Sequence, residues 1–286
     1  MKRLALVFPG IGYTADKPML HYGRRLAERF GYETRVLAYG GFPKKIGGDR
    51  DKLRQCCEIA LRQAEEQLAD TDFCTYDDVL FIGKSIGTVA AAELAANSPA
   101  RERIRLLLYT PLEETFAFPL GDAVVFTGGG DPWVGGSEGR IPALCRERRI
   151  PCFVIEEANH SLETADPLRD VQNLELILRD TNAFIRAEQL RRIRYYETLL
   201  QELRQALARP GAAELSALRA KAEELGEYLG SEDWKRDFSD EEAGLLPRDM
   251  PRGVLSEDGL YNALEAFRER LAEAKERQGE NGHDKG

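Results

Sequence analysis

Short apolar runs alternate with longer amphipathic stretches along the first two thirds of the chain. The apolar runs are rich in β-branched and aromatic residues and predict strands at residues 4–8, 34–38, 79–82, 105–109, 123–127 and 152–155. Apolar residues at helical spacing fill the intervals and predict helices at 18–30, 51–68, 88–97, 141–148 and 170–188. Strands that alternate with helices predict an α/β fold, with a mostly parallel, doubly wound sheet that helices cover on both faces.

The pattern changes near residue 191, where charged residues become denser and the strand-like runs end. Apolar residues at helical spacing predict helices at 193–207 and 215–229, and Pro210-Gly211 between them indicates an antiparallel hairpin. A third helix is predicted at 257–277, with Ser256 as its N-cap. We therefore expect an α/β domain at 1–190, an all-α helical domain at 191–278 and a disordered polar tail at 279–286.

The composition argues against several classes of partner. Of the 286 residues 43% are hydrophobic, and the formal net charge of -9 argues against a nucleic-acid surface, because phosphate binding needs a basic face. No apolar run approaches membrane-spanning length, and the run at 4–8 is too short for a signal peptide. We expect a globular, cytoplasmic protein without nucleic-acid or membrane partners. The five cysteines lack metal-ligand spacing and are expected as buried, reduced thiols: Cys56, Cys57, Cys74, Cys145 and Cys152.

The run LFIGKSIGTVAAA, at residues 80–92, fits two different chemistries. A P-loop needs a glycine five positions before the glycine of GKS, but Asp78 occupies that position and an apolar strand follows it. The glycines instead flank the serine, at Gly83 and Gly87, which matches the nucleophile-elbow pattern G-x-S-x-G before an alanine-rich helix. Ser85 is therefore the candidate nucleophile; the alternative is a strand-turn-helix corner whose serine only caps the helix.

Candidate partners of this serine follow two later strands. Ligands bind at the carboxyl ends of the strands in such sheets, and two of these ends carry TGGGDPWV and EEANHSLE. Ser85, Asp131 and His160 thus follow three strands in the chain order characteristic of α/β-hydrolases. A serine nucleophile needs an imidazole base, and the imidazole needs a carboxylate to hold its tautomer. Taken singly, His160 could be an ordinary loop residue and Asp131 a turn residue.

Other histidines and acids fit these roles less well. His21 lies in a predicted helix and His283 in the polar tail. Asp122 precedes its strand, which places it at the wrong end of the sheet.

Acyl transfer also needs hydrogen-bond donors for the oxyanion of the substrate. We expect the backbone N–H of Ile86, the residue after the serine, as one donor. The loop PGIGYT follows the first strand, and its Ile11 N–H is the expected second donor, with Gly12 or Tyr13 as alternatives.

The connection after the fourth predicted strand is too short for a helical cap, which predicts an open cleft suited to small acyl groups. Phe116 and Phe118 in this connection are expected to line the cleft, and Tyr13 and Trp133 are further expected substrate-binding residues. Lys84, next to the serine, is expected to be a solvated lysine.

Four separated motifs resemble those of a known group: FPGIGYTADKPML, GKSIGT, TGGGDPW and ANHSLE. Together they look like the small, lidless α/β-hydrolases related to dienelactone hydrolase, a bacterial group. The resemblance covers residues 1–190 and implies Ser85 as nucleophile, Asp131 as acid and His160 as base. Pro9 departs from it, since many relatives carry a histidine before the oxyanion glycine, and the first two strands of the larger fold are missing. Dienelactone hydrolase has a cysteine nucleophile, so its own activity is not implied.

The second segment resembles a small bacterial domain of unknown function through YYETLLQEL, SEDWKRDF and LPRDMPRGVLSEDGLYNAL. Trp234 and Tyr261 are expected in its core. A cluster of acids has the spacing of no calcium loop and is expected as a solvated acidic turn: Asp237, Asp240, Glu241 and Glu242.

These features predict a serine hydrolase that cleaves a small carboxylic ester or thioester through an acyl-enzyme on Ser85. We expect a small acyl substrate and neither a metal nor a cofactor, and the acidic C-terminal helices could bind a protein partner. The alternative is a non-catalytic scaffold or interaction protein built on a hydrolase fold.

Overall fold

The chain divides into two compact units, Met1–Ile185 and Arg186–Gly286. The computed structural model describes residues 2–47, 49–134, 139–208, 216–247 and 250–283. One long helix, α5 (Pro167–Leu207), crosses the division and contributes residues to both units. The expected boundary after residue 190 lies within this helix.

The first unit is built on a six-stranded parallel sheet, which confirms the predicted α/β class. The strand order is β2-β1-β3-β4-β5-β6, which is the order of an α/β-hydrolase sheet without its first two strands. All six strands were predicted, with their ends misplaced by a few residues at most: β1 (Arg3–Phe8), β2 (Tyr32–Val36), β3 (Asp78–Lys84), β4 (Ile104–Tyr109), β5 (Asp122–Gly128) and β6 (Cys152–Ile155).

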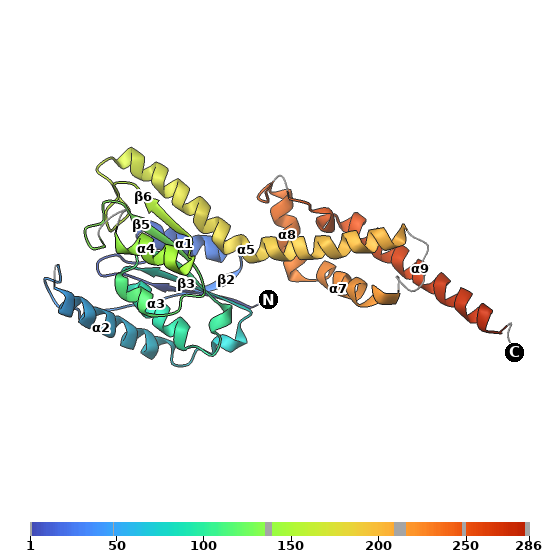
Figure 1. Ribbon diagram of the computed structural model, residues 1–286, viewed down its shortest axis with the longest axis horizontal. Helices are drawn as coiled ribbons and strands as arrows, with labels where there is room; N and C mark the ends of the chain where they lie inside the picture. The colour runs from blue at the N-terminus through green and yellow to red at the C-terminus, as the bar shows by residue number, and fades with distance from the viewer. Residues whose placement is uncertain (1, 48, 135–138, 209–215, 248–249, 284–286) are drawn as a thin grey trace. The chain divides into compact units, whose positions relative to one another are not determined.

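Helices cover both faces of this sheet (Figure 1). Alternate strand residues point to opposite faces, so Leu106 and Leu108 of β4 lie in one apolar cluster and Leu107 and Tyr109 lie in the other. The first cluster includes residues of α2 (Arg50–Leu68), α3 (Ile86–Asn97) and α4 (Arg140–Arg148). The second includes residues of α1 (Pro18–Arg29) and of α5. Both faces of the sheet are therefore buried, so a ligand is expected at the carboxyl ends of its strands.

The connection between β4 and β5 contains a short 3-10 helix, Glu113–Ala117. It is too short to form a helical cap over the sheet, as the sequence predicted. Of the helices that the structure describes, none is both long enough and apolar enough to cross a membrane. All five cysteines are free, and the prediction that they are buried is wrong for Cys74, which is exposed, and for Cys152, which is half-buried.

The second unit is helical. Its core joins apolar residues of α5, α7 (Arg219–Leu229), α8 (Glu232–Glu242) and α9 (Glu257–His283). Ser256 caps α9 as predicted, because its Oγ accepts the Gly259 N–H at 3.2 Å. Trp234 is buried as predicted, and its Nε1 donates to the Val254 carbonyl at 3.0 Å. Tyr261 is 54% exposed, so its predicted place in the core is wrong.

Three predictions for the second half of the chain are wrong: a helix break, an acidic turn and a disordered tail. The predicted break between residues 188 and 193 is absent, because Gln189, Leu190, Arg191 and Arg192 are compatible with a helix and α5 continues through them. The predicted solvated acidic turn is wrong, because all four of its residues lie on α8 and one of them, Asp237, is fully buried. Helix α9 extends to His283, into the tail predicted to be disordered. The predicted Pro210-Gly211 turn lies outside the described residues.

Candidate active site

Ser85 occupies a strained turn between β3 and α3. Its backbone has φ 56° and ψ −125°, a region that non-glycine residues rarely adopt and that holds strain at functional sites. Gly87 permits this turn: a Cβ there would lie 2.1 Å from the carbonyl oxygen of Phe8 at the end of β1. The Ser85 side chain makes no capping hydrogen bond to α3, so it does not act as a plain helix cap.

The loops after β5 and β6 bring an acid and an imidazole to this serine. His160 Nε2 lies 2.8 Å from Ser85 Oγ, and His160 Nδ1 lies 2.7 Å from Asp131 Oδ2. Gly128 allows the two loops to approach, because a Cβ there would lie 2.2 Å from the Ala158 carbonyl oxygen. The structure thus brings together all three residues that the sequence assigned to catalysis.

Asp131 is held in one orientation. It is 1% exposed, and its Oδ1 accepts the Trp133 backbone N–H at 2.9 Å. Its Oδ2 therefore faces His160 Nδ1, and a carboxylate there favours the tautomer that carries its proton on Nδ1. In that tautomer Nε2 is an acceptor for the Ser85 hydroxyl proton.

The surroundings of His160 favour its neutral form. Burial is the largest influence and lowers the pKa of the ring, the nearby Lys84 lowers the pKa further, and the hydrogen bond and charge of Asp131 oppose both. The net pKa lies below the usual value for histidine, which leaves the ring unprotonated and able to accept a proton at neutral pH.

Two segments near Ser85 offer backbone N–H groups for an oxyanion. Ile86 is the first residue of α3, and the first N–H groups of a helix have no partner within it. The loop after β1 borders the serine, since a Cβ on Gly10 would lie 3.1 Å from Ser85 Cβ. The Tyr13 N–H donates to the Gly10 carbonyl, which removes Tyr13 from the alternatives. Within the described part of the chain no hydrogen bond engages the Ile11 or Gly12 N–H, so Ile11 remains a candidate.

Lys84 is buried, and the prediction that it is solvated is wrong. Its side chain is 1% exposed, and Nζ donates to Thr110 Oγ1 at 2.5 Å and to the His160 carbonyl at 2.7 Å. Nζ also lies 4.8 Å from the centre of the Tyr13 ring. The prediction followed the general rule that lysines are exposed, and Lys84 is an exception to that rule. The apolar run before Lys84 places its backbone in the sheet, but its side chain is buried by partners that follow other strands.

A cavity of about 350 Å³ lies beside the site. Its apolar walls are Leu53, Leu112, Pro132, Trp133 and Val134, and its charged residues are Asp49, Arg50, Glu113 and Glu114. Trp133 links it to the site, because its ring centre lies 5.9 Å from that of His160. Trp133 thus lies where a substrate residue was predicted.

Three other predicted substrate residues do not line this cavity. Phe116 is 3% exposed and packs in the core beside α3 and α4. Phe118 also packs against this core. Tyr13 is buried, and its hydroxyl accepts the Met19 N–H at 3.2 Å. From the β4–β5 connection, Leu112 faces the cavity instead, a role for which the sequence contained no signal.

No group of three or more His, Cys, Asp or Glu side chains with the arrangement of a metal site occurs among the described residues.

Comparison with known proteins gives a match to each part of the chain. Residues 191–276 match DUF4298, a domain of unknown function, which confirms the resemblance of the second segment to such a domain. No curated protein sequence matches the chain.

Among solved structures, a lidless α/β serine hydrolase from Xanthomonas campestris is 14% identical, with a TM-score of 0.46, and the match covers 65% of this chain and 81% of that one. A serine hydrolase homologue from Coxiella burnetii is 19% identical, with a TM-score of 0.39 and coverage of 63% and 84%. An esterase from Pyrococcus furiosus is 13% identical, with a TM-score of 0.44 and coverage of 65% and 82%. The fold assignment depends on the strand order and on the turn at Ser85 rather than on these similarities.

Proposed function

We propose that the protein is a serine hydrolase that cleaves a small carboxylic ester or thioester through an acyl-enzyme on Ser85. The observation that carries this proposal is the hydrogen-bonded chain from Ser85 Oγ through His160 to Asp131, formed at a strained strand-to-helix turn. A serine hydroxyl is a weak nucleophile until a base within hydrogen-bond reach can take its proton, and here a ring nitrogen lies 2.8 Å away.

The reaction divides into acylation and deacylation. Ser85 Oγ attacks the carbonyl carbon while its proton passes to His160 Nε2, and the backbone N–H groups of Ile86 and Ile11 donate to the oxyanion. The imidazolium that forms is stabilised by the Asp131 carboxylate. His160 then gives the proton to the leaving alcohol or thiol, which departs. A water molecule repeats the attack on the acyl group, releases the acid and restores Ser85.

The cavity beside Trp133 supports a small substrate. Its volume of about 350 Å³ lies near the lower end of the usual range for small-molecule sites, roughly 300–1,000 Å³. Five of its lining residues are apolar, which suits an uncharged acyl chain. The short β4–β5 connection leaves the neighbouring strand ends without a helical cap, which is consistent with substrates that enter directly from solvent.

Labelling with a fluorophosphonate tests the proposal. The full-length protein should form one covalent adduct, located by mass spectrometry on Ser85, and should hydrolyse p-nitrophenyl acetate. Ser85→Ala should abolish the adduct and lower kcat by about 10⁵-fold or more. Ser239→Ala, in the second unit, is the matched control and should label like the wild type. An unlabelled wild-type protein would favour a non-catalytic scaffold. A Ser85→Ala variant that labels normally would mean that the assignment of Ser85 as the nucleophile is wrong.

A panel of esters and thioesters with graded acyl length would define the substrate class. The cavity predicts a maximum of kcat/KM at short acyl chains and a decline for long ones. Equal turnover of long-chain lipids and acetate would contradict this assignment.

A further inference from the structure

Lys84 carries a buried ammonium group directly beside the proposed nucleophile. It is the last residue of β3 and precedes Ser85 in the chain. Its Nζ reaches Thr110, which follows β4, and the backbone carbonyl of His160, in the loop after β6. One side chain therefore connects three segments that are far apart in the sequence and that meet at the carboxyl edge of the sheet.

We propose that Lys84 is a positioning residue, whose ammonium group holds the His160 loop against the ends of β3 and β4. This inference rests on the proposed function, because the geometry that it maintains is that of the serine and its base. Lys84 itself contacts neither of the reacting atoms.

The contacts show why a lysine performs this role. Asp131 binds the ring of His160, and Lys84 binds its backbone carbonyl, so the residue is held from both ends. The ammonium group directs its donors to Thr110 Oγ1 and His160 O, while the Tyr13 ring lies beside it. An apolar side chain of similar length, such as methionine, would fill the same space without making either hydrogen bond. It would also leave the Thr110 hydroxyl and the His160 carbonyl without this donor.

The charge of Lys84 has a second consequence for His160. The groups that face the ammonium are Asp131, Glu163, Tyr13 and the His160 ring. Burial lowers the pKa of Lys84 to about 7, although Asp131 and Glu163 oppose this shift. Lys84 Nζ donates to the backbone carbonyl of His160, and its charge is one of the influences that lower the pKa of the His160 ring. Its positive charge then disfavours the imidazolium, so removal of that charge should raise the pKa of His160.

A histidine titration by NMR tests this consequence without depending on catalysis. The chain has three histidines, so the ¹⁵N-histidine signals can be assigned with His21→Gln and His283→Gln. In Lys84→Met the pKa of His160 should rise relative to the wild type. Lys235→Met, which replaces an exposed lysine of the second unit, is the control and should leave the pKa unchanged. An unchanged His160 titration in Lys84→Met would overturn the electrostatic coupling.

Kinetics test the positioning role. Lys84→Met should lower kcat/KM for p-nitrophenyl acetate by about 10-fold to 100-fold, because a displacement of about 1 Å at a reacting group can have an effect of that size. The acid limb of its pH profile should also move to higher pH, a change that loss of stability alone would not produce. Wild-type kcat/KM together with a wild-type profile would overturn the proposal.

Thr110→Val provides an independent test if Lys84→Met fails to fold. Valine has the shape of threonine but removes the acceptor of the Lys84 ammonium, while the positive charge beside His160 remains. We expect a smaller loss of kcat/KM than in Lys84→Met and a His160 pKa close to that of the wild type. Full activity in Thr110→Val would show that the link to β4 is not needed. If the wild type neither labels nor hydrolyses esters, the proposed function fails, whereas the histidine titration still tests the contact of Lys84 with His160.

Discussion

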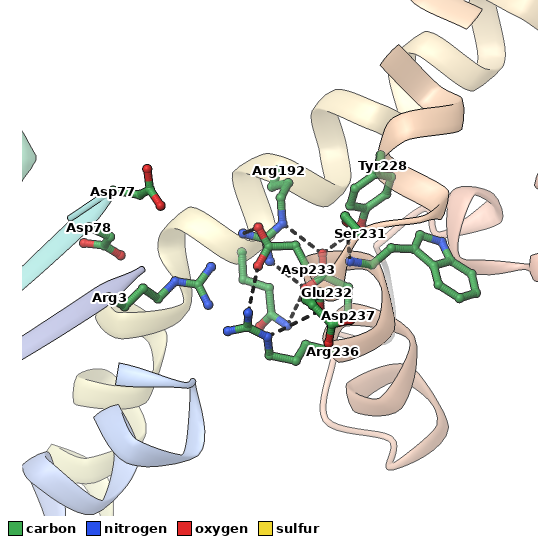
Figure 2. Close-up of polar contacts among 12 residues, drawn as sticks. Arg3, Asp77, Asp78, Arg192, Tyr228, Ser231, Glu232, Asp233, Arg236 and Asp237 are labelled. Atoms are coloured by element: carbon green, nitrogen blue, oxygen red, sulfur yellow. Dashed lines mark hydrogen bonds and ion pairs between the residues drawn. The ribbon is translucent and has the colours of Figure 1, made fainter. Parts of the chain in front are cut away.

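Each unit of the protein buries an aspartate, and the two carboxylates have opposite surroundings. Asp237 in the second unit is fully buried and accepts four hydrogen bonds: from Arg192 Nε at 3.0 Å and a terminal Arg192 nitrogen at 2.7 Å, from Gln189 Nε2 at 2.9 Å and from the Tyr228 hydroxyl at 2.7 Å. Figure 2 shows Arg192 and Tyr228 directed at this carboxylate. Asp131 in the first unit accepts from the Trp133 N–H and from the ring of His160.

The difference lies in the charge of the side chain that donates hydrogen bonds to each carboxylate. The guanidinium of Arg192 always carries its charge, so the charge of Asp237 is balanced in the resting protein. The ring that donates to Asp131 has a pKa lowered by burial and is neutral at neutral pH, and in the proposed reaction it gains a charge when it takes the serine proton. The ammonium group of Lys84 is a further positive charge that faces Asp131. We therefore expect Asp237 to have a structural role and Asp131 to act in the proposed reaction. Four predictions test this contrast, beginning with the largest expected effect.

Asp131→Asn should remove activity while preserving the fold. Asparagine keeps the shape but no longer stabilises the imidazolium or fixes the tautomer, and we expect kcat to fall by about 10⁴-fold. The measurement is hydrolysis of p-nitrophenyl acetate, with circular dichroism to check folding. Asp122→Asn, which changes an aspartate half exposed at the opposite end of β5, is the control and should remain active. Similar losses in both variants would mean that Asp131 has no special role.

Asp237→Asn should have the reverse effect. It leaves the buried Arg192 guanidinium with only the more distant carboxylate of Asp233, at 3.7 Å, and loss of one member of a buried pair destabilises by about 3–5 kcal/mol. We expect the free energy of unfolding from urea titration to fall by that amount. Ester hydrolysis, measured well below the unfolding transition, should stay near the wild-type rate. A loss of activity in the folded variant would show that the polar cluster around Asp237 supports the active site and is not purely structural.

Two glycines allow the same comparison for the backbone, since one lies at the turn beside Ser85 and the other lies inside a helix of the second unit. Gly87→Ala would place a Cβ 2.1 Å from the Phe8 carbonyl oxygen, and this overpacking should destabilise the protein by about 3 kcal/mol. Gly226 lies inside α7, where an added Cβ meets nothing within 4 Å, so Gly226→Ala should stabilise by up to about 1 kcal/mol. Thermal unfolding of both variants measures the difference. Equal effects would mean that the turn at Ser85 can relax around a side chain.

The smallest expected effect is a displaced pH profile. Only the neutral form of His160 can accept the serine proton, so kcat/KM should rise with pH as the ring loses its own proton. Burial lowers the pKa of His160, which places the midpoint below about 6.5, the usual histidine value. The measurement is kcat/KM between pH 4 and pH 8, roughly the range over which a histidine base titrates. A midpoint well above 6.5 would mean that Asp131 outweighs burial, and His160→Gln should remove the dependence together with most activity.

Features with a local signal could be predicted well from the sequence. All six strands were predicted because their apolar runs are short and bounded, and β6 was placed correctly at both ends. Helix α8 was missed although its signals were present: Ser231 caps the Trp234 N–H at 3.0 Å, and Glu232 and Asp233 occupy the first turn. The prediction missed this helix because most of its residues are charged. The helix nevertheless buries Trp234 and Asp237.

The sequence by itself determined the order of strands and helices, the turn at Ser85 and the placement of Asp131 and His160 after later strands. These follow from periodicity and from glycines at short range, which act between near neighbours in the chain. Only the tertiary structure decided which polar side chains are buried. Lys84 is buried because its partners, Thr110 and His160, lie 26 and 76 residues further along the chain. Asp237 is buried because Arg192, 45 residues earlier, supplies its counter-charge. A charged group is buried at low cost only where a partner replaces its hydration. These partners lie far along the chain, so the local sequence pattern does not predict them.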